Sequence, residues 1–115
     1  LRASDPQVGA FHKQWDIKQR LGPIEENPAR WSELTVINVV DTLKKGELAI
    51  SIDCGDKDFF LTTNRQLHAK LKAMGIAHDY AEHPGAHNWD YWKLALTRQM
   101  AFAARHLEHG TVDAR

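Results

Sequence analysis

Two short polar stretches of the sequence carry the residue types that acid–base chemistry requires. The stretch DCGDKD offers carboxylates at Asp53, Asp56 and Asp58, and the stretch HPGAHNW offers imidazoles at His83 and His87. A carboxylate that accepts a hydrogen bond from an imidazole fixes the tautomer of the ring and stabilises its positive form, as in the acid–histidine part of a nucleophilic triad. The two stretches are therefore candidates for one shared catalytic site.

Strands and a helix are expected to hold these stretches beside each other. The small and β-branched apolar run at 48–52 is typical of a strand buried on both faces, and apolar spacing predicts a helix over 59–75. A second, shorter strand is expected at 76–82, ended by the Pro84-Gly85 break. This order predicts parallel strands joined by a right-handed crossover helix. Functional residues of such sheets gather on loops beyond the carboxyl ends of the strands, where both stretches fall.

Apolar residues recur at helical spacing in both helices of this expected unit. In the crossover helix they are Phe60, Leu67, Leu71 and Met74. In a long C-terminal helix they are Trp92, Leu96, Met100, Ala103 and Leu107. Such stripes are typical of helices that cover a sheet, and Trp92 is expected in the core.

The segment 1–47 differs from the rest, because breakers separate its short helical signals. Gly22-Pro23 and Asn27-Pro28 interrupt it, and the asparagine is suited to cap a helix that the following proline begins. We expect an irregular, short-helical segment that covers the pocket of a strand–helix–strand–helix unit at 48–109. No internal repeat or Ser/Gly linker occurs, so the chain is expected to be one domain or part of one.

Two strands do not complete a sheet, because their outer edges expose unpaired backbone groups. The first 47 residues show no strand pattern, so we expect another polypeptide to supply the neighbouring strands, either a missing N-terminal half of the same protein or a second copy. The sequence begins with Leu1, without a targeting pattern, and we interpret its natural N-terminus as lost. The predicted fold is α/β, with parallel strands, crossover helices and a sheet that is incomplete in this chain.

Composition excludes several classes of protein. Of the 115 residues, 43% are hydrophobic and 26% are charged, and no apolar run approaches the length of a membrane-spanning helix. Basic and acidic residues number 15 each, without the basic stripe that nucleic-acid binding requires. The single cysteine cannot form an internal disulfide and does not decide the cellular compartment. We expect a soluble globular protein that binds neither nucleic acid nor membrane.

The two polar stretches and the elements between them resemble the C-terminal region of a family of esterases with the α/β-hydrolase fold. The family includes esterase D (S-formylglutathione hydrolase), feruloyl esterases, tributyrin-type esterases and mycolyltransferases. The resemblance is strongest over 48–107 and extends more weakly back to Trp15. In the family a Gly-x-x-Asp after the strand supplies the acid of a Ser-His-Asp triad, which implies this role for Asp58 after Gly55. A Pro-Gly-x-His, followed by a polar and an aromatic residue, supplies the histidine, which implies that role for His87.

The nucleophile is the main departure from the family. No G-x-S-x-G occurs in the sequence, and no oxyanion-hole loop can be recognised. Family members are more than twice this length and carry the serine on an earlier strand. The resemblance therefore implies a serine carboxylic-ester hydrolase, without a cofactor or metal, whose serine lies on an N-terminal part outside this sequence. The chain alone is expected to be inactive.

Other residues compete for the two catalytic roles. Asp58 could instead cap the following helix, Asp56 is its nearest rival as the acid, and Asp53 is expected to bond loop backbone at the end of the strand. His87 could be an ordinary loop histidine in a short hydrogen bond. His83 is expected to have no chemical role.

Metal and thiol chemistry are disfavoured. His83 and His87 are four residues apart, a spacing that brings two ligands together only on a helix, and Pro84-Gly85 prevents a helix there. Cys54 shares the loop of the acid and lacks a sharp turn of its own, so the sequence favours a buried structural thiol.

Aromatic residues near the candidate histidine suggest a surface for substrate. Trp89 could border the pocket and stack on a sugar ring, with simple packing as the alternative. The expected substrate is a small ester, and an acylated sugar is one candidate. A second class of function stays open, a non-catalytic module derived from a hydrolase that binds a carbohydrate or a partner protein. His106 and His109, near the C-terminal end, are expected to have no chemical role.

Overall fold

A computed structural model describes residues 15–108 of the 115-residue chain. The chain divides into two compact units between Thr42 and Leu43, and each unit is described by itself. Residues 1–14, part of the segment expected to cover the pocket, lie outside the described residues, as does His109. The candidate acid and histidine both belong to the second unit.

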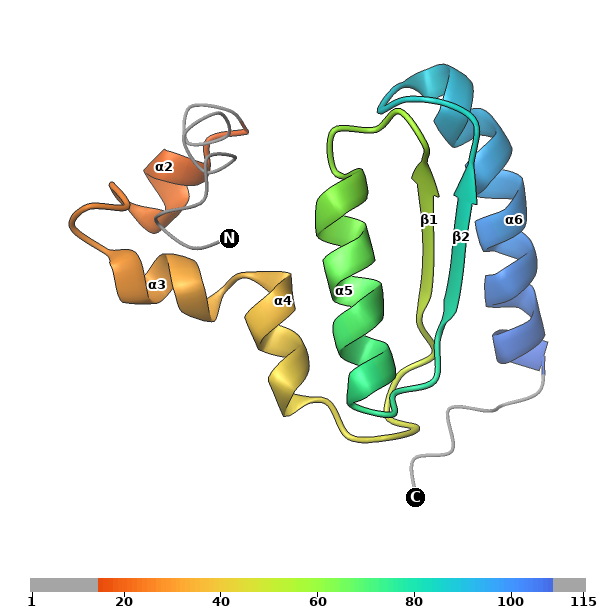
Figure 1. The fold of residues 1–115 in the computed structure, drawn as a ribbon, viewed down its shortest axis with the longest axis horizontal. Coiled ribbons are helices and arrows are strands. Elements are labelled where there is room, and N and C mark those ends of the chain that lie inside the picture. Colours follow the sequence, from red (N-terminus) through yellow and green to blue (C-terminus); the bar gives the residue numbers. More distant parts are fainter. Residues whose placement is uncertain (1–14, 109–115) are drawn as a thin grey trace. The chain divides into compact units, whose positions relative to one another are not determined.

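In its described part the first unit consists of short helices (Figure 1), and its Trp31 is buried. Its helices are α2 (Ile17–Leu21), α3 (Pro28–Glu33), α4 (Val36–Val39) and the 3-10 helix η1 (Val40–Thr42). The indole N–H of the buried Trp31 donates to the carbonyl oxygen of Gly22 at 2.9 Å. α3 begins at Pro28 as expected, but Asn27 does not cap it, because its side-chain amide donates to the carbonyl oxygen of Pro23 at 3.1 Å.

The second unit is built from two strands and two helices. They are β1 (Ser51–Gly55), α5 (Leu61–Ala73), β2 (Asp79–His83) and α6 (Trp89–Glu108). β1 and β2 pair in parallel, from Ser51 opposite Asp79 to Gly55 opposite His83. α5 lies along one face of the sheet and α6 along the other (Figure 1). The predicted α/β fold with parallel strands and a crossover helix is confirmed, and the sheet has only these two strands within the described residues.

Side chains along β1 alternate between the two helices, because successive residues of a strand point to opposite faces. On one face, Asp53 accepts hydrogen bonds from Tyr91 and Arg98 of α6. On the other face, Cys54 accepts a hydrogen bond from Asn64 of α5. Both faces of the strand are therefore covered, as is usual for parallel sheets.

The core of the second unit is small. Its buried hydrophobic residues are Cys54, Leu71, Ile76, Tyr91 and Ala95. Leu71, on the apolar stripe predicted for the crossover helix, is the most completely buried, with 1% of its surface exposed. Because a small core contains few large side chains, each of them contributes a large share of the stability.

β1 lies three residues later than the apolar run that predicted it. The strand was expected at 48–52, whereas β1 extends from Ser51 to Gly55. A strand requires a partner, and β2 supplies one only from Asp79 onward. Leu48, at the start of the run, is consequently 55% exposed. Apolar composition identified the region of the strand, but the partner strand decides where it begins.

α6 packs on the sheet through a different face from the one the sequence indicated. On the face that meets the sheet, Tyr91 and Ala95 are buried, Phe102 is half-buried, and the half-buried Arg98 bonds Asp53 of β1. On the expected stripe Trp92 is half-buried, whereas Leu96, Met100, Ala103 and Leu107 are exposed. The helix has two adjacent apolar faces, and spacing alone does not show which of them meets the sheet.

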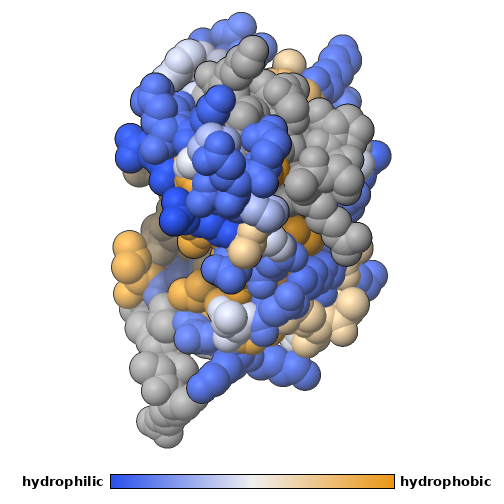
Figure 2. All heavy atoms as spheres, turned by 90° about the vertical axis from the view of Figure 1, so that its left-hand side faces the viewer, coloured by the Kyte–Doolittle hydropathy of each residue, from blue (hydrophilic) through white to orange (hydrophobic). Residues whose placement is uncertain are grey.

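Most of the surface drawn in Figure 2 is hydrophilic, with hydrophobic residues in smaller groups between the polar ones. Large exposed hydrophobic residues of the second unit are Leu48, Phe59, Trp89, Leu94, Leu96, Met100 and Leu107. Most of them belong to α6, so this helix carries much of the apolar surface that remains uncovered. Among the described helices, none combines the length and the apolar character needed to cross a membrane.

Replacement of Leu71 by alanine should show how much the small core depends on one side chain. Truncation of a buried leucine costs about 2–5 kcal/mol, and we expect a decrease in this range in the free energy of unfolding measured with denaturant. Leu94→Ala is the matched control, because Leu94 of α6 is 66% exposed, and it should change stability by less than about 0.5 kcal/mol. Equal losses for the two variants would contradict the assignment of the core.

Candidate active site

The loops that follow β1 and β2 are joined by hydrogen bonds. The amide of Asp56 donates to the carbonyl oxygen of His83, and the amide of Lys57 to that of Gly85, each at 2.8 Å. The amide of Gly85 donates in turn to Oδ1 of Asp56 at 3.0 Å. These bonds continue the pairing of the strands past their ends, so the loops that carry the candidate acid and histidine lie side by side.

Two glycines allow the loops to approach so closely. A Cβ atom at Gly55 would lie 2.3 Å from the carbonyl oxygen of Gly85. Gly85 itself has a φ of 144°, which favours glycine, and a Cβ there would lie 2.6 Å from the ring of Tyr91. A side chain at residue 55 would push the two loops apart, and one at residue 85 would push the second loop away from Tyr91 of α6.

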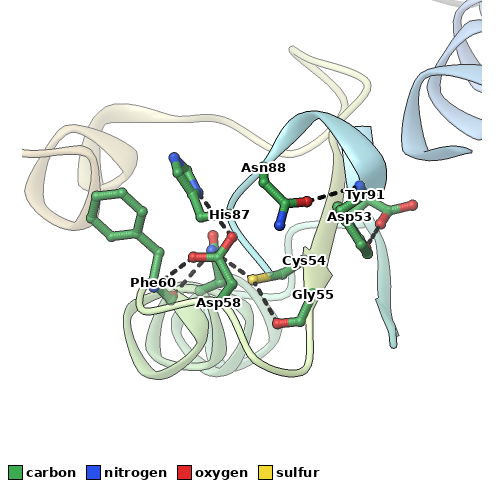
Figure 3. Close-up of polar contacts among 9 residues, drawn as sticks. Asp53, Cys54, Gly55, Asp58, Phe60, His87, Asn88 and Tyr91 are labelled. Atoms are coloured by element: carbon green, nitrogen blue, oxygen red, sulfur yellow. Dashed lines mark hydrogen bonds and ion pairs between the residues drawn. The ribbon is translucent and has the colours of Figure 1, made fainter. Parts of the chain in front are cut away.

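Asp58 and His87 meet between these loops (Figure 3). Nδ1 of His87 lies 2.9 Å from Oδ2 of Asp58, and the exposed fractions of the two side chains are 29% and 6%. The other carboxylate oxygen accepts a hydrogen bond from the amide of Phe60 at 2.8 Å. Asp58 thus bonds the turn that precedes α5 and the imidazole at the same time. The alternative that Asp58 caps the following helix is wrong, because the N-cap residue of α5 is Phe60 and no side chain caps it.

The contact with Asp58 determines which nitrogen of His87 carries the proton in the neutral ring. An ionised carboxylate can only accept, so the proton of this contact is on Nδ1 and the lone pair is on Nε2. Within residues 15–108, no group forms a hydrogen bond with Nε2. His87 therefore presents a proton acceptor on the side of the ring opposite the carboxylate.

Aromatic rings surround the imidazole of His87. Its centroid lies 4.6 Å from that of Phe59, 5.3 Å from that of Phe60 and 4.9 Å from that of Trp92. These rings restrict rotation of the imidazole and lower the local dielectric constant, which strengthens its hydrogen bond to the carboxylate.

Trp89 lies at the start of α6, beside this aromatic cluster. Its ring centroid is 5.3 Å from that of Trp92, and 73% of its surface is exposed. Together with Trp92 and Leu96 it lines an open, mostly apolar groove that also borders Ile52 and Asp53 of β1. The aromatic surface near His87 therefore continues along the groove to β1.

Asp53 bonds side chains of α6, and the expectation that it bonds loop backbone is wrong. Its Oδ2 accepts from Nε of Arg98 at 2.6 Å, and its Oδ1 accepts from Nη2 of the same residue at 3.0 Å and from the hydroxyl of Tyr91. Burial of this carboxyl, 5% exposed, would raise its pKa, but the hydrogen bonds from Arg98 and Tyr91 outweigh burial and lower the pKa below its ordinary value. Asp53 is thus a buried, ionised carboxylate that is committed to α6.

The remaining carboxylate and imidazole candidates have other partners. The carboxylate of Asp56 accepts from the backbone of Gly85. Nε2 of His83 lies 4.0 Å from Oδ2 of Asp53. Of the three carboxylates considered from the sequence, the structure brings only Asp58 into hydrogen-bonding contact with His87.

The thiol of Cys54 lies on the side of β1 that faces α5. It is 2% exposed, and its Sγ accepts a hydrogen bond from the side-chain amide of Asn64 at 3.3 Å. Burial raises the pKa of the thiol above its ordinary value. Because a protonated thiol is a weak nucleophile, this environment is that of a structural cysteine.

Residues 15–108 contain no group of three or more His, Cys, Asp or Glu side chains that could hold a metal ion. His68 and His78 bond each other, with 2.7 Å between Nδ1 of the first and Nε2 of the second. His78 precedes β2, at the opposite end of the sheet from His87. His106, in the last turn of α6, contacts the ring of Phe102 with 4.4 Å between centroids.

Sequence reasoning missed Tyr91 and Arg98, the two partners of Asp53. They are seven residues apart, so they lie on the same face of a helix after two turns. This spacing was visible in the sequence, but the carboxylate that it faces depends on where α6 crosses the sheet.

The pKa of Asp53 predicts a dependence of stability on pH. Because the folded-state pKa is lowered from 3.8, the carboxylate contributes stability that is fully present above the unfolded-state pKa and is lost as pH falls through the lower folded-state value. Asp53→Asn should lower the free energy of unfolding at neutral pH by about 2 kcal/mol, the value of hydrogen bonds to a charged group. It should also flatten the acid-induced decline below about pH 5.

Asp79→Asn is the control for this experiment. Asp79 faces Arg105 at 3.6 Å, and both side chains are more than half exposed. Loss of such a surface pair should cost less than about 1 kcal/mol. Denaturant unfolding at several pH values compares the variants, and an acid decline as steep in Asp53→Asn as in the parent would contradict the prediction.

Comparison with known proteins agrees with the resemblance seen in the sequence. Residues 10–103 match the family described as "Putative esterase". An acetyl esterase of Caldicellulosiruptor saccharolyticus is 42% identical over 63 residues, which are 54% of this chain and 24% of that protein. A solved structure of a ferulic acid esterase is 28% identical, with a TM-score of 0.51, over 70% of this chain and 31% of its own.

The chain spans about a quarter of the acetyl esterase and under a third of the ferulic acid esterase. Its strands and helices are similar to part of the larger esterase structure. The family match covers well over half of the chain, including both loops of the candidate site. The chain belongs to the Putative esterase family.

Proposed function

We propose that the protein to which these residues belong is a serine carboxylic-ester hydrolase, with Asp58 and His87 as the acid and histidine of a Ser-His-Asp triad. The observation that carries this proposal is the 2.9 Å contact between Oδ2 of Asp58 and Nδ1 of His87. The contact leaves Nε2 able to accept a proton from a nucleophile. Membership of the esterase family supports the same class of reaction.

In this proposal His87 acts first as a base and then as an acid. Nε2 takes the proton of the serine hydroxyl as its oxygen bonds to the ester carbonyl carbon. The imidazolium then returns the proton to the alcohol as its bond to that carbon breaks, and water releases the acyl group by the same relay. Asp58 keeps Nδ1 protonated and stabilises the positive ring. General acid–base catalysis of this kind contributes about 10²–10⁴ in rate.

The serine and the oxyanion-hole donors belong, in this proposal, to a part of the protein beyond these 115 residues. The sequence lacks the G-x-S-x-G motif that presents the serine on a sharp strand-to-helix turn. The acetyl esterase relative is much longer, since this chain spans 24% of it. An oxyanion-hole donor alone is worth about 10²–10³ in rate. The acid and the histidine by themselves are therefore expected to be inactive.

The remainder of the protein is proposed to pack beside β1. β2 occupies one edge of this strand, and in the described residues the other edge has no strand partner. Trp92 and Leu96 of α6 line the groove beside it. A further strand at this edge would satisfy the backbone of β1 and cover the apolar groove. A second copy of the chain would compete for the same edge.

The substrate is proposed to be a small ester that contains a flat ring or a sugar. Phe59 and Trp89, which are 50% and 73% exposed, offer aromatic faces near His87. Such faces bind flat aromatic rings and the apolar faces of sugars by stacking. The two relatives are described as an acetyl esterase and a ferulic acid esterase, which agrees with an ester substrate.

A fluorophosphonate probe, which reacts with an activated serine, tests the proposed triad. Intact-mass spectrometry should show one added phosphonyl group on the complete gene product and none on the 115-residue chain alone. His87→Ala in the complete protein should abolish labelling. Asp58→Asn should lower kcat about 10⁴-fold, because the amide favours the wrong tautomer of the histidine.

Asp56→Asn is the matched control in the same loop. An asparagine oxygen can still accept the hydrogen bond from the amide of Gly85, so kcat should stay close to that of the parent. Labelling that survives His87→Ala would contradict the role of this histidine. A complete protein without any reactive serine would instead support a binding module derived from a hydrolase.

Trp89→Ala tests the proposed substrate surface in the complete protein. Loss of one stacking contact, about 0.5–1.5 kcal/mol, should raise KM for an aryl ester about 2–10-fold. The kinetics of a small acetyl ester and the free energy of unfolding should change little, because Trp89 is largely exposed. Steady-state kinetics with both esters and with Leu94→Ala as control check this. Equal effects on the two esters would contradict stacking.

A further inference from the structure

Asp53, Tyr91 and Arg98 form a polar cluster, the Asp53 cluster, that the proposed reaction does not use. Both oxygens of the carboxylate are engaged, by the guanidinium at 2.6 and 3.0 Å and by the tyrosine hydroxyl. The carboxylate belongs to β1 and its two partners to α6. Because a buried charge is costly unless it is fully paired, this cluster strongly restricts where α6 can lie on the sheet.

Tyr91 connects the Asp53 cluster to the loop that carries His87 (Figure 3). The ring of Tyr91 lies against Gly85, where an added Cβ would be 2.6 Å from its Cδ2. Its backbone amide donates to Oδ1 of Asn88 at 3.2 Å. Gly85 and Asn88 stand on either side of His87 in the sequence. Tyr91 therefore contacts the loop on both sides of the histidine.

β1 and the loop after it consequently act on His87 by two routes. Asp58 bonds the ring directly, at 2.9 Å. Asp53, five residues earlier, is joined to the loop on both sides of the histidine through Tyr91. The imidazole meets Asp58 only where the loop holds the backbone of His87 at the correct place, and a displacement of about 1 Å is enough to impair such a contact.

We propose that Asp53, Tyr91 and Arg98 are positioning residues that hold the His87 loop where Nδ1 meets the carboxylate of Asp58. The proposal rests on the proposed triad and adds residues that touch neither substrate nor reacting atoms. The hydrogen bond from the Tyr91 hydroxyl to Asp53 links β1 to the His87 loop.

The protonation states of the Asp53 cluster allow its hydrogen bonds to persist when the pH changes. Burial and the neighbouring Asp53 carboxylate raise the pKa of Tyr91 well above its ordinary value, so the phenol keeps its proton. Burial opposes ionisation of Asp53, but its hydrogen bonds with Arg98 and Tyr91 lower its pKa. The tyrosine therefore donates and the carboxylate accepts throughout the neutral range of pH.

Tyr91→Phe separates the hydrogen bond from simple packing, because the ring that lies against Gly85 is kept. Tyr80→Phe is the matched control. The hydroxyl of Tyr80 donates to Oε1 of Glu82 at 2.7 Å, and its ring stacks on His68 with 4.1 Å between centroids. Each variant therefore removes one tyrosine hydroxyl that bonds a carboxylate, but only Tyr91 contacts the histidine loop.

Nuclear magnetic resonance of the 115-residue chain, labelled with ¹⁵N in histidine, supplies the readout without any need for the serine. The Nδ1–H signal of His87 is assigned with His87→Ala, and its exchange with water is measured. We expect Tyr91→Phe to raise this exchange rate about tenfold, since a bond to a charged group is lost. Tyr80→Phe should leave the rate within about twofold of the parent, because the hydroxyl that it removes has no contact with the loop.

Arg98→Lys is a second, milder variant, which keeps the positive charge and loses the two-point contact. It should raise the exchange rate of the His87 Nδ1–H about threefold. If Tyr91→Phe does not fold, this variant tests whether the Asp53 cluster positions the His87 loop. Exchange of the backbone amides of α5 checks that the fold is intact. Folded variants with the exchange rate of the parent overturn the proposal. If the Nδ1–H of His87 exchanges as fast in the parent as in Asp58→Asn, the contact between Asp58 and His87 is not formed. This result would contradict both the proposed triad and the positioning role.

Discussion

The carbonyl oxygen of Gly85 occupies the space that a side chain at residue 55 would need, 2.3 Å from its Cβ position. This close approach allows the loops after β1 and β2 to bond each other directly. Asp58 follows Gly55 by three residues and His87 follows Gly85 by two, so the contact between carboxylate and imidazole depends on this crossing of the loops. A change that moves these two loops apart also moves the carboxylate of Asp58 away from the imidazole of His87.

The same short segment presents two buried carboxylates in different electrostatic environments. Asp53 is neutralised by the guanidinium of Arg98, whereas Asp58 bonds the backbone amide of Phe60 and the imidazole of His87. A carboxylate whose charge is already neutralised by a fixed cation stabilises a nearby imidazolium only weakly. Within residues 15–108 no lysine or arginine pairs with Asp58, which agrees with its proposed role of stabilising a positive ring, whereas Arg98 commits Asp53 to α6.

The second unit has the organisation of one side of a larger sheet. Both faces of β1 are covered, yet α6 keeps an apolar face on which Leu96 and Met100 are exposed, and Leu96 lines the groove along β1. Parallel strands are stable where neighbours satisfy their edges and helices cover their faces. The short span that this chain covers in its esterase relatives agrees with such an arrangement. In the proposed hydrolase, the part of the protein that completes the sheet would also supply the nucleophile.

Local patterns were sufficient to predict the alternation of strands and helices and the two loops at the strand ends, because they depend on residues close together in the sequence. They did not show where β1 begins, which is set by its partner, or which apolar face of α6 meets the sheet. The choice of Asp58 over Asp53 as the neighbour of His87 also required the tertiary structure. The two residues of that contact are 29 positions apart. Their distance is decided by how two loop backbones approach, which no local pattern encodes.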